Sequence, residues 1–137
     1  MQLYETDFRA WALEQARRLR SGESVDVEHV SEELEGLGRS EQQQLVNRLA
    51  ALIAHWLKWE YQTENRSRNW LGTIHEQQKR IKRLLARNPS LTSVVGESIE
   101  ESYEIAVTFA SVDTGIIEDD FPAGCPYTLE QLLSEPC

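Results

Sequence analysis

The sequence predicts an all-α protein, an irregular bundle of about five main helices followed by a short C-terminal helix. Apolar residues recur at three- and four-residue intervals in successive segments, which is the spacing of one helix face. No segment alternates apolar and polar side chains in the manner of a half-buried strand. The chain has 137 residues, 40% hydrophobic and 27% charged, so we expect a single domain over residues 1–137.

Helix-ending residues divide the chain into segments. We expect core helices at roughly 6–20, 27–37, 41–63, 67–87 and 91–113, with a tail over 116–137. Thr6 or Asp7 can accept a hydrogen bond from an early backbone N–H of the first helix, and Gly22 follows its end. The apolar face of this helix contains Tyr4, Phe8, Trp11, Ala12 and Leu19.

The second helix can be capped by Asp26, and Gly36 and Gly38 weaken its end. Ser40 can cap a third helix, with Gln43 where a capping box places Glu or Gln. A single kinked helix through both segments is the alternative. We expect the second helix to bury Val27, Val30, Leu34 and Leu37.

The third helix is expected at the centre of the fold, because it is apolar over more than one stripe and must be enclosed by others. Its apolar residues are Leu45, Val46, Leu49, Ala50, Leu52, Ile53, Trp56, Leu57 and Trp59. The fourth helix should end at Asn88, since the residue before a proline disfavours the helical region. The fifth, capped by Ser90, is expected to bury Ile105 and Phe109 and to end near Asp113–Gly115.

Charge is distributed in opposed blocks along the second half of the chain. Residues 96–137 contain ten acidic side chains and no Lys or Arg, whereas residues 65–95 contain seven basic side chains and one Glu. Helices joined by a short connection usually pack as antiparallel neighbours, so we expect the basic helix at 67–87 and the acidic helix at 91–113 to neutralise each other. Together with the net charge of -9, this argues against nucleic-acid binding and against an anionic membrane surface.

The composition also bears on the compartment. No apolar run approaches the ~18–20 residues of a membrane-spanning helix, and the first residues do not form an export signal. We therefore expect a cytoplasmic protein in which Cys125 and Cys137 are free thiols.

One candidate site lies on the second predicted helix. Asp26, His29 and Glu33 fall along one edge of its apolar stripe, and His55 flanks the stripe of the third helix. An imidazole beside carboxylates at this spacing is a ligand set for a divalent metal. The motifs of di-iron bundles and of zinc peptidases are absent. We favour a structural role for these residues, and we expect no cofactor.

A second candidate is a polar cluster at the helix margins, which could form a groove for an anion or another ligand beside the tryptophans. It consists of Asp26, His29, Glu33, Arg48, His55, Arg66, Trp70, Thr73 and Gln77. The alternative, which we favour, is a buried network in which Arg48 and Arg66 satisfy Glu33 and Asp26, because a half-paired buried charge is costly.

Motifs of nucleophilic catalysis and phosphate-binding loops are missing from the sequence. We therefore favour a non-enzymatic protein-interaction or regulatory module, which could bind a protein partner or associate with itself. A metal-binding protein or metal-dependent enzyme is the first alternative. A nucleic-acid-binding regulator that uses the basic helix at 66–87 is the second.

Several short motifs together resemble a known family. They are Asp7-Phe8 with Trp11, Asp26 with Glu32-Glu33-Leu34-Glu35 and Gly38, Leu57-Lys58-Trp59, Arg66-Ser67-Arg68-Asn69-Trp70, Thr73-Ile74, Gln77, Asn88-Pro89-Ser90-Leu91, and Cys125-Pro126-Tyr127. This pattern is similar to domain-of-unknown-function family twenty-nine, a set of small helical bacterial proteins. The resemblance implies a helical, cytoplasmic, single-domain protein, and it brings no catalytic or ligand-binding residues with it.

Overall fold

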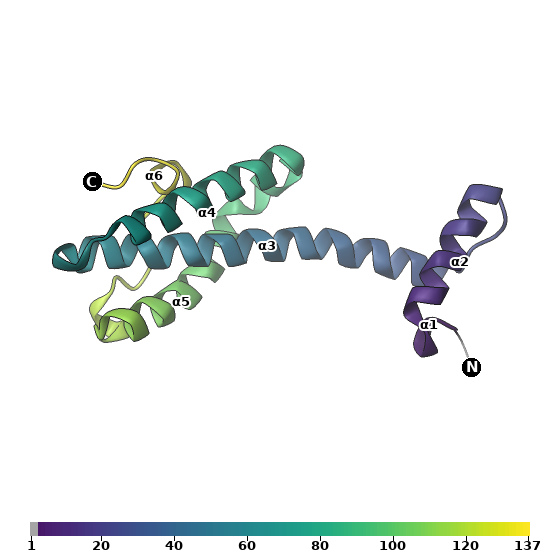
Figure 1. Cartoon of the computed structure of the whole chain (residues 1–137), viewed down its shortest axis with the longest axis horizontal. Helices are drawn as coiled ribbons and strands as arrows, with labels where there is room; N and C mark the ends of the chain where they lie inside the picture. Colours follow the sequence, from purple (N-terminus) through teal and green to yellow (C-terminus); the bar gives the residue numbers. More distant parts are fainter. Residues whose placement is uncertain (1–2) are drawn as a thin grey trace. The chain divides into compact units, whose positions relative to one another are not determined.

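A computed structural model of the protein describes residues 3–137 and confirms the all-α class, with no strand in that range (Figure 1). The α-helices are α1 (Leu3–Thr6), α2 (Phe8–Ser21), α3 (Val27–Tyr61), α4 (Arg68–Arg87), α5 (Val95–Thr114) and α6 (Leu129–Leu132). Short 3-10 helices follow α3, α4 and α5, namely η1 (Thr63–Asn65), η2 (Pro89–Val94) and η3 (Glu118–Asp120).

The chain forms two compact units, which we call the N-terminal unit (Met1–Ser40) and the C-terminal unit (Glu41–Cys137). Residues 27–40 of α3 belong to the first unit and residues 41–61 belong to the second. That both units fold together as one domain stays a prediction.

The N-terminal unit contains α1, α2 and the first part of α3. The Asp7 carboxylate caps α2 by accepting a hydrogen bond from the backbone N–H of Ala10, and Gly22 ends the helix with a φ of 74°. This left-handed conformation favours glycine, as the sequence predicts. Trp11 is the one apolar side chain that is buried among the described residues of this unit, and its ring packs edge-on against Tyr4.

One sequence prediction is corrected in α3. The helix runs without interruption from Val27 to Tyr61, whereas separate helices were expected at 27–37 and 41–63. A glycine inside a helix costs only about 1 kcal/mol. A break would create two new helix ends, each with four unpaired backbone groups. Continuing the helix through Gly36 and Gly38 therefore costs less than stopping it.

The C-terminal unit is built around the second half of α3, as the sequence predicts. In Figure 1, α4 and α5 flank this part of α3, and all three helices contribute to one apolar core. The side chains with no exposed surface include Leu45, Leu49, Leu52, Ile53 and Leu57 of α3, Ile74 and Ile81 of α4, and Ala106 of α5.

The segment after α5 is part of this core, although it has little regular structure. Phe121, Tyr127 and Leu132 are buried in it. Gln78 of α4 donates hydrogen bonds from Nε2 to the carbonyl oxygens of Leu132 (2.8 Å) and Ser134 (2.7 Å). The predicted short helix at Thr128 is confirmed as α6, which a capping box between Thr128 and Gln131 begins.

The start and the outer face of α5 also differ from expectation. Residues 89–94 form η2, and α5 begins at Val95, because the segment that starts at Pro89 closes into tighter three-residue turns. Ile105 and Phe109 lie at the surface, and Phe109 is 55% exposed; both line a hollow together with residues of α3. The predicted end is confirmed: Thr114 is the last residue, and Gly115 follows with a φ of 79°.

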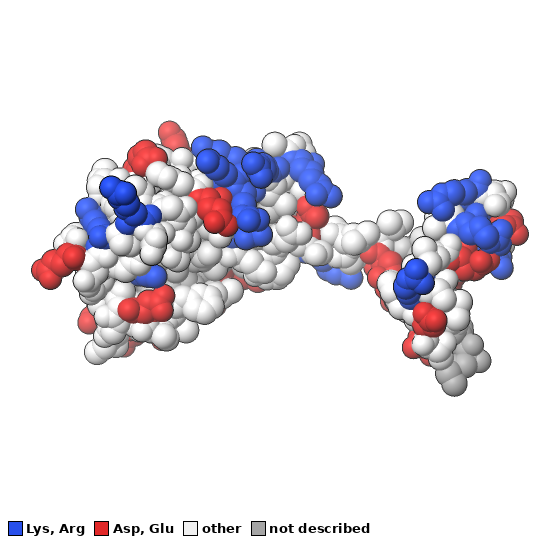
Figure 2. All heavy atoms as spheres, in the orientation of Figure 1, with Lys and Arg blue, Asp and Glu red and all other residues white. Residues whose placement is uncertain are grey.

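The expected pairing of the basic and acidic helices does not occur. Among residues 3–137, no ion pair joins α4 to α5; Arg80 pairs with Glu76 within α4, and Lys58 of α3 reaches Asp113 of α5. Both helices pack on α3 through their apolar faces, so their charged faces point to water. Figure 2 shows Lys and Arg side chains gathered over α4. The basic face of α4 is therefore not neutralised by α5, and the net charge of -9 is the observation that still disfavours nucleic-acid binding.

Trp56→Ala tests the central position of α3. Trp56 is 7% exposed and packs against Tyr127 with ring centroids 5.2 Å apart. We expect the free energy of unfolding to fall by roughly 3–5 kcal/mol in chemical denaturation, because the substitution leaves a large cavity. Val112→Ala, at an exposed position of α5, should change it by no more than about 0.5 kcal/mol. A loss of less than about 1 kcal/mol for Trp56→Ala would contradict the buried position of this helix.

Gly38→Ala tests the continuity of α3. A methyl group at this position meets no atom within 4 Å. We expect the free energy of unfolding to rise by about 0.5–1 kcal/mol, because alanine loses less backbone entropy in a helix interior. Gly22→Ala is the control and should destabilise the protein, since its φ is positive. Destabilisation by Gly38→Ala, measured by circular dichroism during denaturation, would mean that the helix is interrupted there.

Candidate functional site

Two of the predicted site residues, Asp26 and His29, form the polar centre of the N-terminal unit. Asp26 Oδ2 lies 2.6 Å from Nδ1 of His29 and accepts a hydrogen bond of 3.2 Å from the indole N–H of Trp11. The backbone N–H of Asp26 donates to the side-chain oxygen of Gln15, at 2.7 Å. Asp26 thus ties α2 to the start of α3 through both its side chain and its backbone.

The pair changes the acidity of both partners. The hydrogen bond to Asp26 raises the pKa of His29, and the same hydrogen bond from His29 lowers the pKa of Asp26. Because the pKa of His29 is raised in the folded state, its contribution to stability is present below pH ~6.5 and is lost as the pH rises through the raised value. The contribution of Asp26 to stability is present above the ordinary pKa of an aspartate, and it is lost as the pH falls through the lowered pKa of the folded state.

Glu33, the third predicted metal ligand, has a different partner. The hydroxyl group of Tyr4 donates a hydrogen bond to Glu33 Oε1, and this bond raises the pKa of Tyr4 to about 12. The ring of Tyr4 also stacks on His29, with centroids 4.0 Å apart and planes 21° apart. Asp26 and Glu33 are therefore satisfied within their own unit, by His29, Trp11 and Tyr4 and not by the arginines that were expected.

This arrangement favours the structural interpretation of the cluster. His55, the fourth candidate ligand, belongs to the C-terminal unit, where its Nδ1 lies 2.9 Å from the carbonyl oxygen of Ala51. Burial lowers the pKa of His55. Within residues 3–137, no group of three or more His, Cys, Asp or Glu side chains is placed to hold a metal ion.

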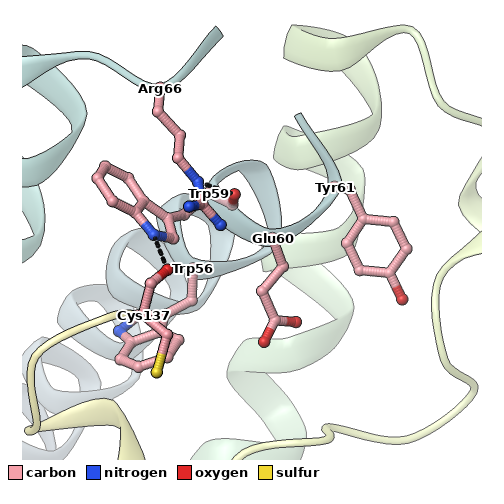
Figure 3. A pocket seen from close by; sticks show the side chains of 6 residues that line it. All are labelled: Trp56, Trp59, Glu60, Tyr61, Arg66 and Cys137. Atoms are coloured by element: carbon pink, nitrogen blue, oxygen red, sulfur yellow. Dashed lines mark hydrogen bonds between the residues drawn. The ribbon is translucent and has the colours of Figure 1, made fainter. Parts of the chain in front are cut away.

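Arg66 lies in a hollow of about 430 Å³ at the end of α3 (Figure 3). Its guanidinium carbon is 4.7 Å from the ring centroid of Trp59, and its Nε donates to the Trp59 carbonyl oxygen at 2.8 Å. The indole N–H of Trp59 in turn donates to the carbonyl oxygen of Cys137, at 2.8 Å. Arg66 therefore fixes the end of α3, and its stacking on Trp59 uses one face of the guanidinium group.

The remaining predicted residues are distributed over the C-terminal unit. Trp70 lies under the ammonium group of Lys58, whose Nζ is 5.0 Å from the ring centroid. Thr73 is partly buried on α4. Gln77 is 9% exposed, and its Oε1 has no hydrogen-bond partner. Arg48 lies beside the arginines of α4 and lines a different hollow from Arg66. A shared function for these residues stays a prediction.

Sequence reasoning missed three contacts that organise these sites. Tyr4 reaches Glu33 across 29 positions, Lys58 reaches Asp113 across 55, and Trp59 reaches Cys137 across 78. The sequence gives one weak indication for Lys58. A lysine within a strongly apolar stretch must extend its ammonium group to water or to an acidic partner. For Tyr4 and Cys137, no local pattern points to the partner.

An apolar surface is the other prominent feature of the N-terminal unit. Large apolar side chains on two helices are more than half exposed, including five that were expected on buried faces, Phe8, Leu19, Val27, Leu34 and Leu37. Within 40 residues, α2 and the first part of α3 do not cover each other's apolar faces. We call this the N-terminal apolar surface, and it consists of Phe8, Leu13, Leu19, Val27, Leu34 and Leu37.

The fold is that of a small all-α protein, and of the nine predicted polar residues Asp26 and His29 bind each other. No helix within residues 3–137 has the length and apolar character to cross a membrane. A family model described as "Domain of unknown function DUF29" matches residues 3–137, and the chain belongs to this family. Comparison with curated proteins and with solved structures gave no match.

Asp26→Asn tests the hydrogen-bonded pair. We expect the pKa of His29, measured by NMR titration of its ring, to fall toward the ordinary value of ~6.5, because the substitution removes the negative partner. Asp7→Asn is the matched control in the same unit, since asparagine caps a helix as well as aspartate does. An unchanged pKa for His29 in the Asp26 variant would show that the pair does not form in solution.

Proposed function

We propose that this protein is a non-enzymatic interaction module that associates with a second copy of itself through the N-terminal apolar surface. The observation that carries the proposal is the exposure of six large apolar side chains in a unit whose described residues bury only one, Trp11. Exposed apolar side chains that gather on one side of a helix mark an interaction site in soluble proteins.

The apolar surface follows from helical spacing. Phe8 and Leu19 are eleven residues apart on α2 and lie on one side of that helix, whereas Leu13 lies on another side of it. Val27, Leu34 and Leu37 form a stripe on the first part of α3. Removing a fully exposed Val, Leu or Phe side chain from water contributes about 1.5–3 kcal/mol. These side chains are already partly buried, so each contributes less, and their sum must exceed the entropic cost of association.

Charge complementarity supports a second copy as the partner. On α2, Arg9 and Arg20 have no ion pair within residues 3–137, whereas Arg17 and Arg18 pair with Glu14 and Glu23. In the first part of α3, Glu28 and Glu32 likewise have no ion pair within residues 3–137, whereas Glu35 pairs with Arg39. In a two-fold symmetric pair, the basic helix of one copy can lie against the acidic segment of the other, and the same contact forms twice. The product is a four-helix arrangement with its apolar residues inside.

The proposal also includes the compartment. Cys125 is partly buried, Cys137 is exposed, and both are free thiols. Free thiols fit a reducing compartment, so we propose that the protein acts in the cytoplasm.

Light scattering coupled to gel filtration tests the association. We expect wild-type protein to show about twice the mass of the 15.8-kDa chain and to dissociate on dilution. Leu34→Glu should raise the dissociation constant at least about tenfold, because it places a charge in an apolar contact. Val112→Glu makes the same kind of change at an exposed position of α5 and should leave the mass unchanged.

Two outcomes would contradict the proposal. The first is wild-type protein that stays monomeric up to millimolar concentration. The second is an oligomer that Leu34→Glu and Val112→Glu weaken equally, since this would place the contact elsewhere. Added salt should weaken the dimer, because part of its affinity comes from opposite charges near the surface.

A further inference from the structure

A second feature of the C-terminal unit is a hollow of about 290 Å³ along the seam between α3 and α4. Gln44 and Arg48 line it from α3, where they are one turn apart. Arg80, Arg83, Leu84 and Arg87 line it from α4, at positions that share one helix face. We call these six residues the arginine hollow.

The charges in the arginine hollow are almost all unpaired. Arg80 Nε lies 3.0 Å from Glu76 Oε1 on its own helix. Arg48, Arg83 and Arg87 form no ion pair with any residue of the described range, 3–137, and no acidic side chain lines the hollow. Four arginines that line one hollow concentrate positive charge there, although water screens the exposed Arg80, Arg83 and Arg87.

Packing alone does not account for four arginines. The stem of an arginine can cover apolar surface, but Leu84, which is 8% exposed, is the one apolar residue in the lining. The nearest acidic residue in sequence on α3 is Glu41, and it already accepts a hydrogen bond of 2.7 Å from the side chain of Asn88. Arg80 thus has a partner on its own helix, and Arg48, Arg83 and Arg87 have no ion-pair partner within residues 3–137.

We propose that the arginine hollow binds a small ligand that carries two or more phosphate groups. Each guanidinium group can donate two parallel hydrogen bonds to one phosphate, and four such groups match a ligand with several anionic oxygens. The amide of Gln44 adds a neutral donor. The hollow, at about 290 Å³, is close to the lower end of small-molecule sites, and its four arginines give a local positive field that opposes the net charge of -9.

Isothermal titration calorimetry with sodium tripolyphosphate at low ionic strength tests this proposal. We expect one binding site per chain, and sodium sulfate should bind at least about tenfold more weakly because it reaches fewer arginines. Arg83→Gln and Arg48→Gln should each weaken tripolyphosphate binding about tenfold or more. Arg83→Lys should restore only part of the affinity, since a lysine does not form the paired hydrogen bonds.

Lys82→Gln is the matched control. Lys82 is next to Arg83 on α4 and is exposed, but it does not line the hollow, so the same loss of charge should change the affinity less than about twofold. Circular dichroism of each variant checks that the fold is intact.

Three results would overturn the proposal. One is the absence of tripolyphosphate binding at millimolar concentration. Another is equal weakening by Lys82→Gln and Arg83→Gln, which would show attraction by diffuse charge. The third is tighter binding of an oligonucleotide than of tripolyphosphate in a mobility-shift titration, which would identify a nucleic-acid interface on α4.

Discussion

Enclosure of the second half of α3 is the constraint on which the C-terminal unit depends. Five leucine and isoleucine side chains between Leu45 and Leu57 have no exposed surface, and they lie on more than one side of the helix. Covering them requires α4, α5 and the segment after α5 together. Because each covering helix turns its apolar face toward α3, its charged face must turn to water. The exposure of the arginine hollow follows from this packing.

The N-terminal unit is held together by different forces. Its described residues bury only Trp11 as an apolar side chain, and its helices are joined by the contacts among Tyr4, Trp11, Asp26 and His29. Polar and aromatic contacts of this kind define geometry, but each contributes only modestly to net stability. A second copy that covers the N-terminal apolar surface would provide the apolar burial that this unit lacks.

The parts of the fold that the sequence predicts are those that local chemistry determines. Asp7, Gly22, Gly115 and Thr128 mark helix ends because capping depends on a few neighbouring residues. The central position of the second half of α3 is equally predictable, because its apolar surface is too wide to be covered by a single neighbouring helix. The continuity of α3 through Gly38 was only the alternative prediction, because a small propensity cost was interpreted as a helix end. The charge pairing of α4 and α5 failed because neighbours in sequence need not present their charged faces to each other.

The candidate site was harder to predict, for a related reason. Asp26 and His29 meet because they are three residues apart on one helix. The choice between Tyr4 and an arginine as the partner of Glu33 depends on tertiary packing, which a single sequence does not specify. The arginine hollow combines Arg48 of α3 with Arg83 of α4. The sequence shows the spacing of residues along each helix, but not which faces of the two helices meet.

The placement of the tryptophans provides intrinsic spectroscopic probes. Trp11 lies in the N-terminal unit, whereas Trp56, Trp59 and Trp70 lie in the C-terminal unit. The difference in fluorescence between wild-type protein and Trp11→Phe therefore reports on the first unit, and the emission of the variant reports on the second. Coincident transitions from the two signals would identify one cooperative domain, and separate transitions would identify two.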